Sequence, residues 1–470
     1  MCGGCQGVGS EVRGLAKQLR LPLEDSGCGM PRLLDSRNVL PALKSLKISD
    51  AAPLVAVAPA RQGRRAKSAE DLAEKRRQAR RVRWDLKWHS DELKRLVLFG
   101  GSLVDRLGVE PKHFKSSYGC HRRPRYKRGL QGKDVRICWT VNYSKQLNVA
   151  FYQNQFSCGS PWTCPVCAAK IAERRRAELK DVMNRADILG YDVFFMTLTI
   201  RHGMGDDLKK ILDDLLKAYK GLSSGHWAQR VHKMIGYIGT IRVLEVTHGS
   251  NGFHPHIHVL IFVQRGVTTA KEIEELYAEK WIDRCRKKGL PEPVREIACH
   301  VQGGKYADDY VTKWGMIDEM VRGHQKEGKV GGRTPWQLLR DSMDGDKRAG
   351  ELFLIYGDAF FGKRQLSYST GLREKLLLPK ELSDEEIVNA PETNDSQILE
   401  VLDGMAIEAL VEQRLLSQVL DMAEYEVQHN VPGALHSFIA SAIAEYYSKH
   451  KGRRAVLAKR IMYDICCEEE

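Results

Sequence analysis

The sequence predicts an α+β fold built around an antiparallel sheet. Between residues 172 and 314, runs with the two-residue period of strands alternate with runs whose apolar residues recur every three to four positions, as in helices. A Gly- and Asn-rich segment, residues 248–252, separates two strand-like runs and favours a β-hairpin, whose strands are antiparallel. The second of these runs, residues 253–263, alternates histidines with apolar residues, so one face suits a core and the other a functional site.

The composition is that of a globular protein whose positive charge suits binding to nucleic acid. With 470 residues, 43% of them hydrophobic, the chain is long enough for two to three domains with a core. No apolar run approaches a membrane span, and the first residues lack the basic and apolar regions of a secretion signal, so we expect a cytoplasmic protein without membrane contact. The net charge of +14 suits a chain that neutralises nucleic-acid phosphates.

Composition and pattern divide the chain into six expected regions. Residues 61–83 hold ten Lys and Arg against three acids. A helix is expected to start in this segment, and it would lie against either the rest of the protein or DNA. The regions are a loosely ordered leader at 1–60, a basic helical arm at 61–117, a zinc-knuckle region at 118–176, an α+β domain at 177–375, an acidic linker at 376–395 and a helical accessory region at 396–470.

Cysteines cluster between residues 118 and 176. Cys158, Cys164 and Cys167 have the spacing of a zinc knuckle, and a closed tetrahedral site needs one more ligand. Cys138, in an apparent strand, and Cys120, in a turn-like basic segment, are the two candidates, and spacing does not choose between them. The alternative is four unrelated thiols, such as ordinary buried cysteines.

Local patterns give the elements of the α+β domain. The expected helices are residues 172–189, 206–219 and 269–287, and the expected strands are residues 191–200, 234–247, 253–263 and 294–301. Asp206 or Asp207 is suited to begin the second helix. Beyond the domain, residues 376–395 are rich in acids and would repel DNA. Helical patterns at 396–428 and 433–449 predict two amphipathic helices, an accessory or self-association unit.

Three histidines share one face of the strand at 253–263. Because strand side chains alternate, His254, His256 and His258 point to the same side, and histidines in such a set favour a metal site over isolated surface residues. If the hairpin is in register, Glu245 lies across from them and is a third ligand. A carboxylate and two imidazoles suit several divalent ions, including zinc, iron and manganese. The alternative for Glu245 is a plain surface carboxylate.

A further helix is expected around residues 306–314. Tyr306 and Tyr310 are four residues apart and Lys313 follows by three, so all three share one helical face. Such a pair of tyrosines is more often core packing than chemistry. A catalytic cleft, however, needs a phenol and a cation close together, and this helix offers both.

Several of these motifs resemble one known family. His256-Ile257-His258 is similar to the His-hydrophobe-His motif of HUH endonucleases, and residues 245–249 followed by 254–258 resemble plasmid rolling-circle replication initiators, the Rep proteins. Phe195-Met196-Thr197-Leu198-Thr199 resembles the first motif of that family, and Tyr310-Val311-Thr312-Lys313 resembles its Tyr-x-x-Lys nucleophile motif. The resemblance covers residues 115–375.

The resemblance implies the HUH endonuclease fold for residues 177–375, preceded by the zinc knuckle and followed by a small helical region. It implies a metal-dependent enzyme that nicks single-stranded DNA at a plasmid origin and rejoins the strand at termination. Tyr310 would attack the scissile phosphate, leaving a 5′-phosphotyrosine link and a free 3′-hydroxyl for a polymerase. Lys313 would offset charge on the phenolate or on the phosphorane. The partners implied are single-stranded and origin DNA, a host helicase and a polymerase.

The resemblance also narrows the choices that spacing leaves open. The resemblance favours Mg²⁺ or Mn²⁺ as the ion at His256, His258 and Glu245. It also favours Cys120 as the fourth zinc ligand, because these Rep proteins often carry a cysteine at that position. Tyr306 departs from many single-tyrosine plasmid initiators. Its spacing from the next tyrosine is similar to that in initiators of single-stranded DNA phages, where two tyrosines can act in turn.

Two other functions fit the same motifs. A rolling-circle transposase of the same superfamily shares the zinc knuckle, the histidine strand and the tyrosine motif, and transposon ends beside the gene would identify it. A non-enzymatic, zinc-dependent DNA-binding repressor with structural histidines would bind the same DNA without becoming covalently attached to it.

Overall fold

The computed structural model describes residues 69–128, 134–136, 138–303, 332–390 and 395–450, together with the short antiparallel strands β1 (Leu23–Glu24) and β2 (Arg32–Leu33). The chain divides into two compact units. Unit 1 comprises Met1–Asp85, Gly119–Ser157 and Asn389–Glu470, and unit 2 comprises Leu86–Tyr118 and Cys158–Val388. The division falls within the long helix α3 (Ala69–Phe99).

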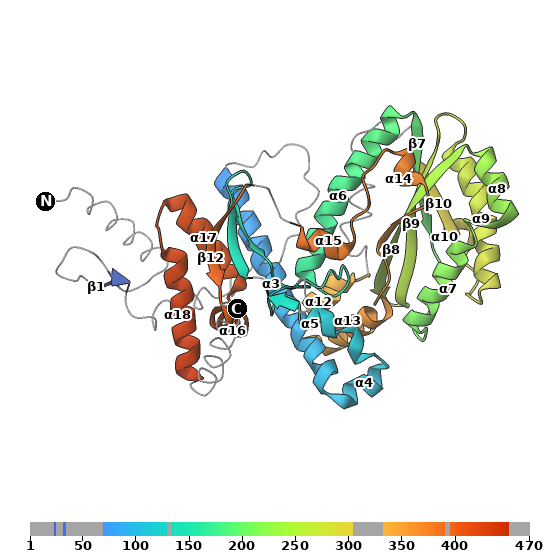
Figure 1. The fold of residues 1–470 in the computed structure, drawn as a ribbon. Coiled ribbons are helices and arrows are strands. Elements are labelled where there is room, and N and C mark those ends of the chain that lie inside the picture. Colours follow the sequence, from blue (N-terminus) through green and yellow to red (C-terminus); the bar gives the residue numbers. More distant parts are fainter. Residues whose placement is uncertain are drawn as a thin grey trace. The chain divides into compact units, whose positions relative to one another are not determined.

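Unit 2 is built on a five-stranded sheet in which every strand is antiparallel to its neighbours (Figure 1). The strand order is β10-β7-β9-β8-β11, so β9 lies at the centre. The strands are β7 (Tyr191–Leu198), β8 (Tyr237–Gly249), β9 (Gly252–Gln264), β10 (Cys299–Gly303) and β11 (Leu366–Tyr368). The predicted α+β fold with an antiparallel sheet is confirmed.

Strands β8 and β9 form the predicted hairpin. Gly249 pairs with Gly252, which leaves a two-residue turn between them. Gly252 has a φ of +86°, and a Cβ built on it would lie 3.0 Å from the carbonyl oxygen of Gly203, so this position requires glycine. A turn of fixed length sets the register of the two strands, and therefore decides which residues face each other across the hairpin.

Helices cover both faces of this sheet. α6 (Pro165–Ile188) packs against one face through a buried core. α7 (Leu208–Lys220) and α9 (Ala270–Lys287) contact β9 and β7 and lie on the opposite side from α6 (Figure 1). The core under α6 includes Leu179, Met183, Phe195, Leu260 and Phe262. These buried apolar contacts hold the central strand rigidly at the place where it carries the histidines.

The remaining helices of unit 2 are short. They are α4 (Gly101–Leu107), a 3₁₀ turn (Pro111–His113), α5 (Lys115–Tyr118), α8 (Gly225–Met234), α10 (Arg295–Ala298), α12 (Pro335–Met343), α13 (Lys347–Ala359), α14 (Leu372–Lys375) and α15 (Asp384–Asn389). Among the described residues, no helix combines the length and apolarity needed to cross a membrane.

One strand of unit 2 begins later than predicted. Residues 294–301 were expected to form a strand, but residues 295–298 form the single helical turn α10, and β10 begins at Cys299. The reason is the length of its partner. Cys299 pairs with Leu198, the last residue of β7, so the residues before Cys299 have no strand to pair with.

Unit 1 contains a three-stranded antiparallel sheet and three helices at the end of the described chain. The sheet has the order β12-β5-β6. Its elements are β5 (Trp139–Ser144), β6 (Val149–Gln153), β12 (Ser396–Leu402), α16 (Gly404–Glu412), α17 (Leu416–His429) and α18 (Ala434–Lys449). The predicted helix at 433–449 is confirmed as α18.

The prediction of one helix over residues 396–428 is wrong, because the first residues form a strand and the rest form two helices, α16 and α17. Residues 396–402 form the strand β12, which pairs with β5, and Asp403 then caps α16 by accepting a hydrogen bond from the backbone N–H of Ala406. The segment Ser396–Leu402 is short and rich in Ile, Leu and Val, so its pattern alone does not distinguish a strand from a helix. Pairing with a strand some 250 positions earlier in the sequence decides the outcome.

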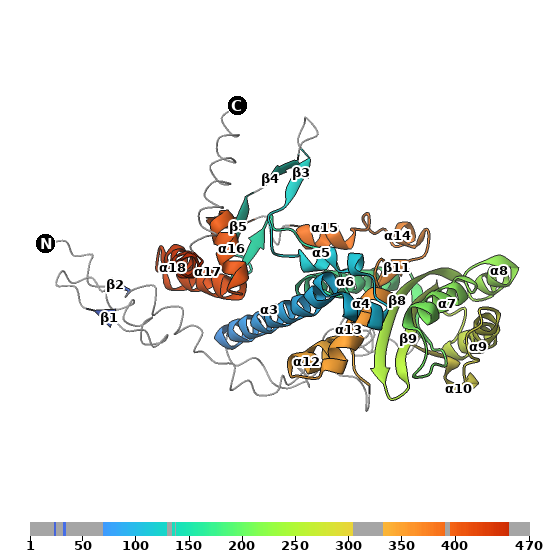
Figure 2. The same cartoon turned by 90° about the horizontal axis from the view of Figure 1, so that it is seen from below.

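A second, smaller sheet of unit 1 is a two-stranded hairpin, β3 (Tyr126–Arg128) and β4 (Asp134–Arg136). Figure 2 shows it extending beyond the ribbons of α16 to α18.

Candidate active site

The predicted metal ligands lie on β8 and β9, the two longest strands of the unit 2 sheet. The register places Glu245 directly opposite His256, and Thr197 of β7 directly opposite His258. In an antiparallel pair, opposite residues point to the same side of the sheet and diagonal neighbours are also within reach. Glu245 therefore meets both His256 and His258, and the predicted hairpin register is confirmed.

The ligand atoms of Glu245, His256 and His258 converge. Glu245 Oε2 lies 3.0 Å from His258 Nε2 and 3.5 Å from His256 Nε2. The side chains of Glu245 and His256 are each 13% exposed and that of His258 is 5% exposed, so the group is shielded from bulk water without being sealed off. The ligand atoms all lie within 4.8 Å of one another, and the group could hold a metal ion.

The second nitrogen of each imidazole ring has a partner of its own. His258 Nδ1 lies 3.1 Å from Thr197 Oγ1, and His256 Nδ1 lies 3.2 Å from the carbonyl oxygen of His254. When Nδ1–H donates to these oxygens, the lone pair of each ring is on Nε2, the atom that faces Glu245. One carboxylate and two such nitrogens form a donor set that fits a divalent cation.

Aromatic rings flank the group. Phe195 stacks on His258 with ring centroids 5.0 Å apart, and His202 stacks on His254 with centroids 4.5 Å apart. Burial, followed by the charges of His256 and His202, lowers the pKa of His254 to about 3. His254 is therefore neutral near pH 7 and adds no charge that would repel a cation.

The predicted tyrosine helix, with Tyr306, Tyr310 and Lys313, lies outside the described residues. The chain on either side of it is held on the unit 2 sheet. Gly303, the last residue of β10, pairs with Phe194 of β7. Arg333 and His248 of β8 exchange two backbone hydrogen bonds, with N···O distances of 2.8 and 2.7 Å.

The cysteines of the predicted zinc knuckle lie where α6 begins. Cys164 is the N-cap residue of α6 and Cys167 belongs to its first turn, and both are buried. Cys158 Sγ lies 3.8 Å from Cys167 Sγ. Of the two candidates for a fourth ligand, Cys120 is buried and Cys138 is exposed. Cys158, Cys164 and Cys167 belong to unit 2, whereas Cys120 and His121, both buried, belong to unit 1.

Sequence reasoning gave no role to Thr197, His202 or His121. Thr197 and His258 are 61 positions apart, so no local spacing could reveal their contact. His202 lies in the loop after β7 and is brought to His254 by the tertiary fold. His121 did carry a signal, because it directly follows Cys120 and histidine, like cysteine, is a usual zinc ligand.

The sequence is similar to one protein family and to several curated proteins. A family model described as replication protein matches residues 149–406. A protein named Protein rep from Streptomyces lividans is 35% identical over 146 residues, which are 25% of this chain and 32% of that protein. A protein named neomycin resistance protein from Streptomyces cyanogenus is 31% identical over 166 residues, 28% of this chain and 38% of that protein.

A Protein rep from Bacillus amyloliquefaciens is 32% identical over 108 residues, 22% of this chain and 30% of that protein. The chain thus spans about a third of the length of the curated relatives it matches. No solved structure matches the chain. The family match covers more than half of the 470 residues and includes Glu245, His256 and His258, and the chain therefore belongs to the replication protein family.

Proposed function

We propose that this protein is a plasmid replication initiator with the HUH endonuclease fold. It nicks one DNA strand at the origin, stays joined to that strand through a tyrosine, and rejoins it at termination. The observation that carries the proposal is the convergence of Glu245, His256 and His258 on two adjacent antiparallel strands. The family match and the relatives named Protein rep support it.

The group at Glu245, His256 and His258 fits Mg²⁺ or Mn²⁺. Three protein donors leave positions for phosphate oxygens and water around an ion that prefers six ligands. When bound, such an ion polarises a phosphoryl oxygen and aligns the phosphate. The chain supplies the rigidity: strand pairing fixes Glu245, and the hydrogen bond to Thr197 fixes the ring of His258.

The proposed nick is a transesterification by Tyr310, in the residues outside those described. The phenolate oxygen bonds to the scissile phosphorus, and the bond from phosphorus to the 3′-oxygen breaks. The 3′-oxygen takes up a proton and becomes the free 3′-hydroxyl that a polymerase extends, while the 5′-phosphate remains esterified to the tyrosine. Lys313 offsets the negative charge that develops in this step. Because no water is consumed, the reverse reaction can rejoin a strand.

Covalent capture of DNA tests this function. The full-length protein is incubated with Mn²⁺ and end-labelled single-stranded oligonucleotides that tile both strands of the replicon carrying the gene. We expect one oligonucleotide to be cut at a single position, with its 3′ fragment migrating with the protein on a denaturing gel. Tyr310→Phe should give neither cut nor adduct, because the attacking oxygen is absent. An adduct formed by Tyr310→Phe at an undiminished rate would assign the nucleophile to another residue.

The same assay separates the two proposed tyrosine roles. One strand transfer opens the origin and a second closes the displaced circle, so a nucleophile already esterified to DNA needs a partner, and we propose Tyr306. Tyr306→Phe is then expected to nick and to form the adduct but to release no closed circles. Normal recircularisation by Tyr306→Phe would instead mean a single-tyrosine initiator. DNA binding without any adduct from the unaltered protein would favour the non-enzymatic DNA-binding protein.

We further propose that the cysteines hold a structural zinc ion. The candidate ligands are Cys120, Cys158, Cys164 and Cys167, and His121 directly follows Cys120 in the sequence. Cys164→Ser is expected to release the zinc and to lower solubility, because metal binding supplies folding free energy to such a segment. Zinc content measured by atomic absorption tests this, with the exposed Cys138→Ser as the matched control that retains a full equivalent. Stoichiometric zinc in Cys164→Ser would contradict the assignment.

A further inference from the structure

Unit 1 carries a hairpin whose sequence is strongly basic. Strands β3 and β4 pair antiparallel, with Tyr126 opposite Arg136 and Arg128 opposite Asp134. Residues 122–128, the base of the hairpin and β3, contain five Lys and Arg and no acid. The hairpin extends beyond the helices of its unit (Figure 2). An excess of positive charge on a narrow two-stranded ribbon is the electrostatic footprint of a nucleic-acid contact.

Backbone hydrogen bonds fix the base of this hairpin. The N–H of Arg125 donates to the carbonyl oxygen of Asn154 at 2.7 Å, and the N–H of Phe156 donates to that of Arg123 at 2.9 Å. The Arg123 guanidinium lies over the Phe156 ring, 4.3 Å from its centroid. Both arginines are exposed, and among the described residues neither forms an ion pair. The base therefore presents two positive charges on an ordered backbone.

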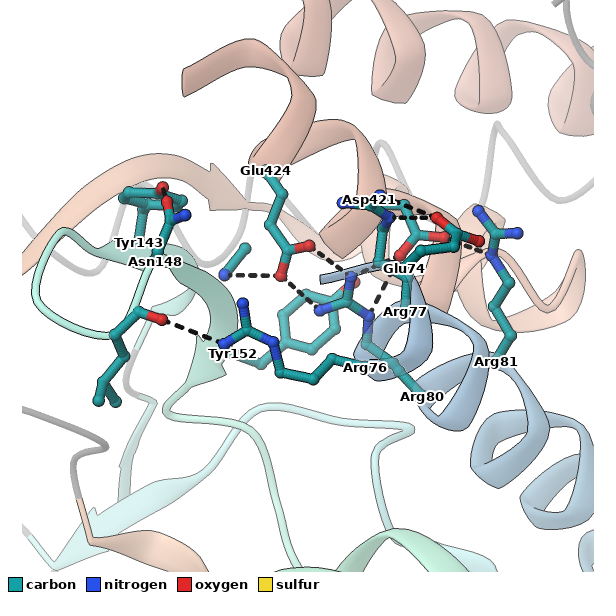
Figure 3. A network of polar contacts seen from close by, with 12 residues as sticks. Glu74, Arg76, Arg77, Arg80, Arg81, Tyr143, Asn148, Tyr152, Asp421 and Glu424 are labelled. Carbon is teal, nitrogen blue, oxygen red and sulfur yellow. Dashed lines mark hydrogen bonds and ion pairs between the residues drawn. The ribbon is translucent and has the colours of Figure 1, made fainter. Parts of the chain in front are cut away.

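The other basic segment of unit 1, the first part of α3, uses its arginines internally (Figure 3). Arg80 donates to Asp421 Oδ1 at 2.5 Å and to Glu424 Oε1 at 2.7 Å, and Arg81 donates to Asp421 Oδ2 at 2.6 Å. Although burial works in the opposite direction, the hydrogen bonds and charges of Glu424 and Asp421 raise the pKa of Arg80 above its ordinary value. Arg80 is therefore committed to α17, and Arg81, although about half exposed, shares the same acid Asp421.

Helices α16 and α17 are connected like a helix-turn-helix, but their charge does not suit DNA. Three residues join them, and Arg414 among these has a φ of +60°. In a DNA-binding helix-turn-helix the second helix enters the major groove. Here that helix, α17, carries no Lys or Arg, so it has no cation of its own to offer to phosphates. The basic hairpin is the better candidate for a DNA contact in unit 1.

We propose that the β3–β4 hairpin is a duplex-DNA contact of this protein, separate from the group that cuts the single strand. The major groove of B-DNA, about 12 Å wide, admits a two-stranded β-ribbon. Arg123 and Arg125 at the base of the ribbon neutralise phosphates beside the groove. The inference rests on the proposed function in one respect, because an initiator must hold the duplex around the strand that it nicks.

The salt dependence of duplex binding tests the hairpin. Affinity of the full-length protein for a 30-base-pair duplex is measured by fluorescence anisotropy at several salt concentrations. Each lost phosphate contact lowers the slope of log K against log salt by about one, so Arg123→Ala/Arg125→Ala should lower it by about two. The matched control is Lys145→Ala/Lys449→Ala, which removes the same charge from two exposed sites of unit 1 and should leave the slope unchanged.

Further variants keep folding and nicking separate from this result. Arg123→Lys/Arg125→Lys retains both charges and should keep the parental slope, which excludes misfolding as the cause of a loss. The alanine pair should still cut a single-stranded oligonucleotide, and His256→Ala should bind the duplex with the full slope. An unchanged slope in Arg123→Ala/Arg125→Ala would overturn the hairpin as the duplex contact. An equal loss of slope in Lys145→Ala/Lys449→Ala would overturn it as well. A protein that never nicks but follows these slopes would disprove only the proposed function.

Discussion

Nicking by His258→Ala or Glu245→Ala is expected to fall by more than about 100-fold, because loss of a residue that merely supports a metal ligand already costs 10- to 100-fold. Each change removes a donor from a group in which Glu245 Oε2 and His258 Nε2 are only 3.0 Å apart. Duplex binding, which rests on Lys and Arg, should persist in both variants. Isothermal titration calorimetry with Mn²⁺ should show the loss of metal affinity directly.

A graded series makes this prediction sharper. Thr197→Val removes the oxygen that receives the Nδ1–H of His258, so its metal affinity should fall between those of the parent and His258→Ala, and Thr197→Ser should restore it. His226→Ala, on the exposed side of α8, is the control and should behave as the parent. Parental Mn²⁺ affinity in His258→Ala would rule out His258 as a ligand, and an equal loss of duplex binding would indicate a structural role instead.

Removal of the Arg80 guanidinium is expected to destabilise unit 1 by roughly 3–5 kcal/mol, the usual cost of breaking a buried ion pair from one side. The Arg80 side chain is 11% exposed, and its partners Asp421 and Glu424 are 13% and 6% exposed. Glu424 also accepts a hydrogen bond from the N–H of Ala150, at 3.1 Å, so it ties β6 to the same cluster. Amide hydrogen exchange of peptides from β5 and β6 measures the loss in Arg80→Ala.

The neighbouring arginine provides the control for this measurement. Arg81 also binds Asp421, but its side chain is 48% exposed, so Arg81→Ala should cost no more than about 1 kcal/mol. Replacement of both Arg80 and Glu424 by methionine should cost less than Arg80→Ala alone, because no buried charge is left without its partner. Equal protection of the β5 and β6 amides in Arg80→Ala and in the parent would show that this cluster contributes nothing to stability.

The site could be predicted from the sequence where it depends on local geometry. The alternation of a strand puts His254, His256 and His258 on one side, and the short turn between Gly249 and Gly252 fixes which residue faces them. Counting back across that turn leads to Glu245. Both rules act within about twenty residues of chain, so a single sequence contains all that they need.

Features that depend on distant pairing could not be predicted. Arg80 and Asp421 are 341 positions apart. Nothing near either residue in the sequence indicates that the basic helix α3 forms ion pairs with the acidic helix α17. The same applies to β12, which is a strand only because β5 offers it an edge. A basic segment that looks suited to DNA is thus partly used for ion pairs inside the protein. A run of Lys and Arg has the same sequence pattern whether it binds DNA or forms internal ion pairs.

The backbone bridge between His248 and Arg333 has a kinetic consequence. Gly303 on β10 and Arg333 beside β8, the strand that carries Glu245, flank residues 304–331 in the chain, and both pair with the same sheet. A group on a chain tethered in this way is confined to a small volume, with an effective concentration on the order of millimolar or above relative to the sheet. Under the proposed function, a DNA end esterified to Tyr310 could not diffuse away from the metal group, and rejoining would be a first-order reaction whose rate does not depend on the concentration of DNA ends.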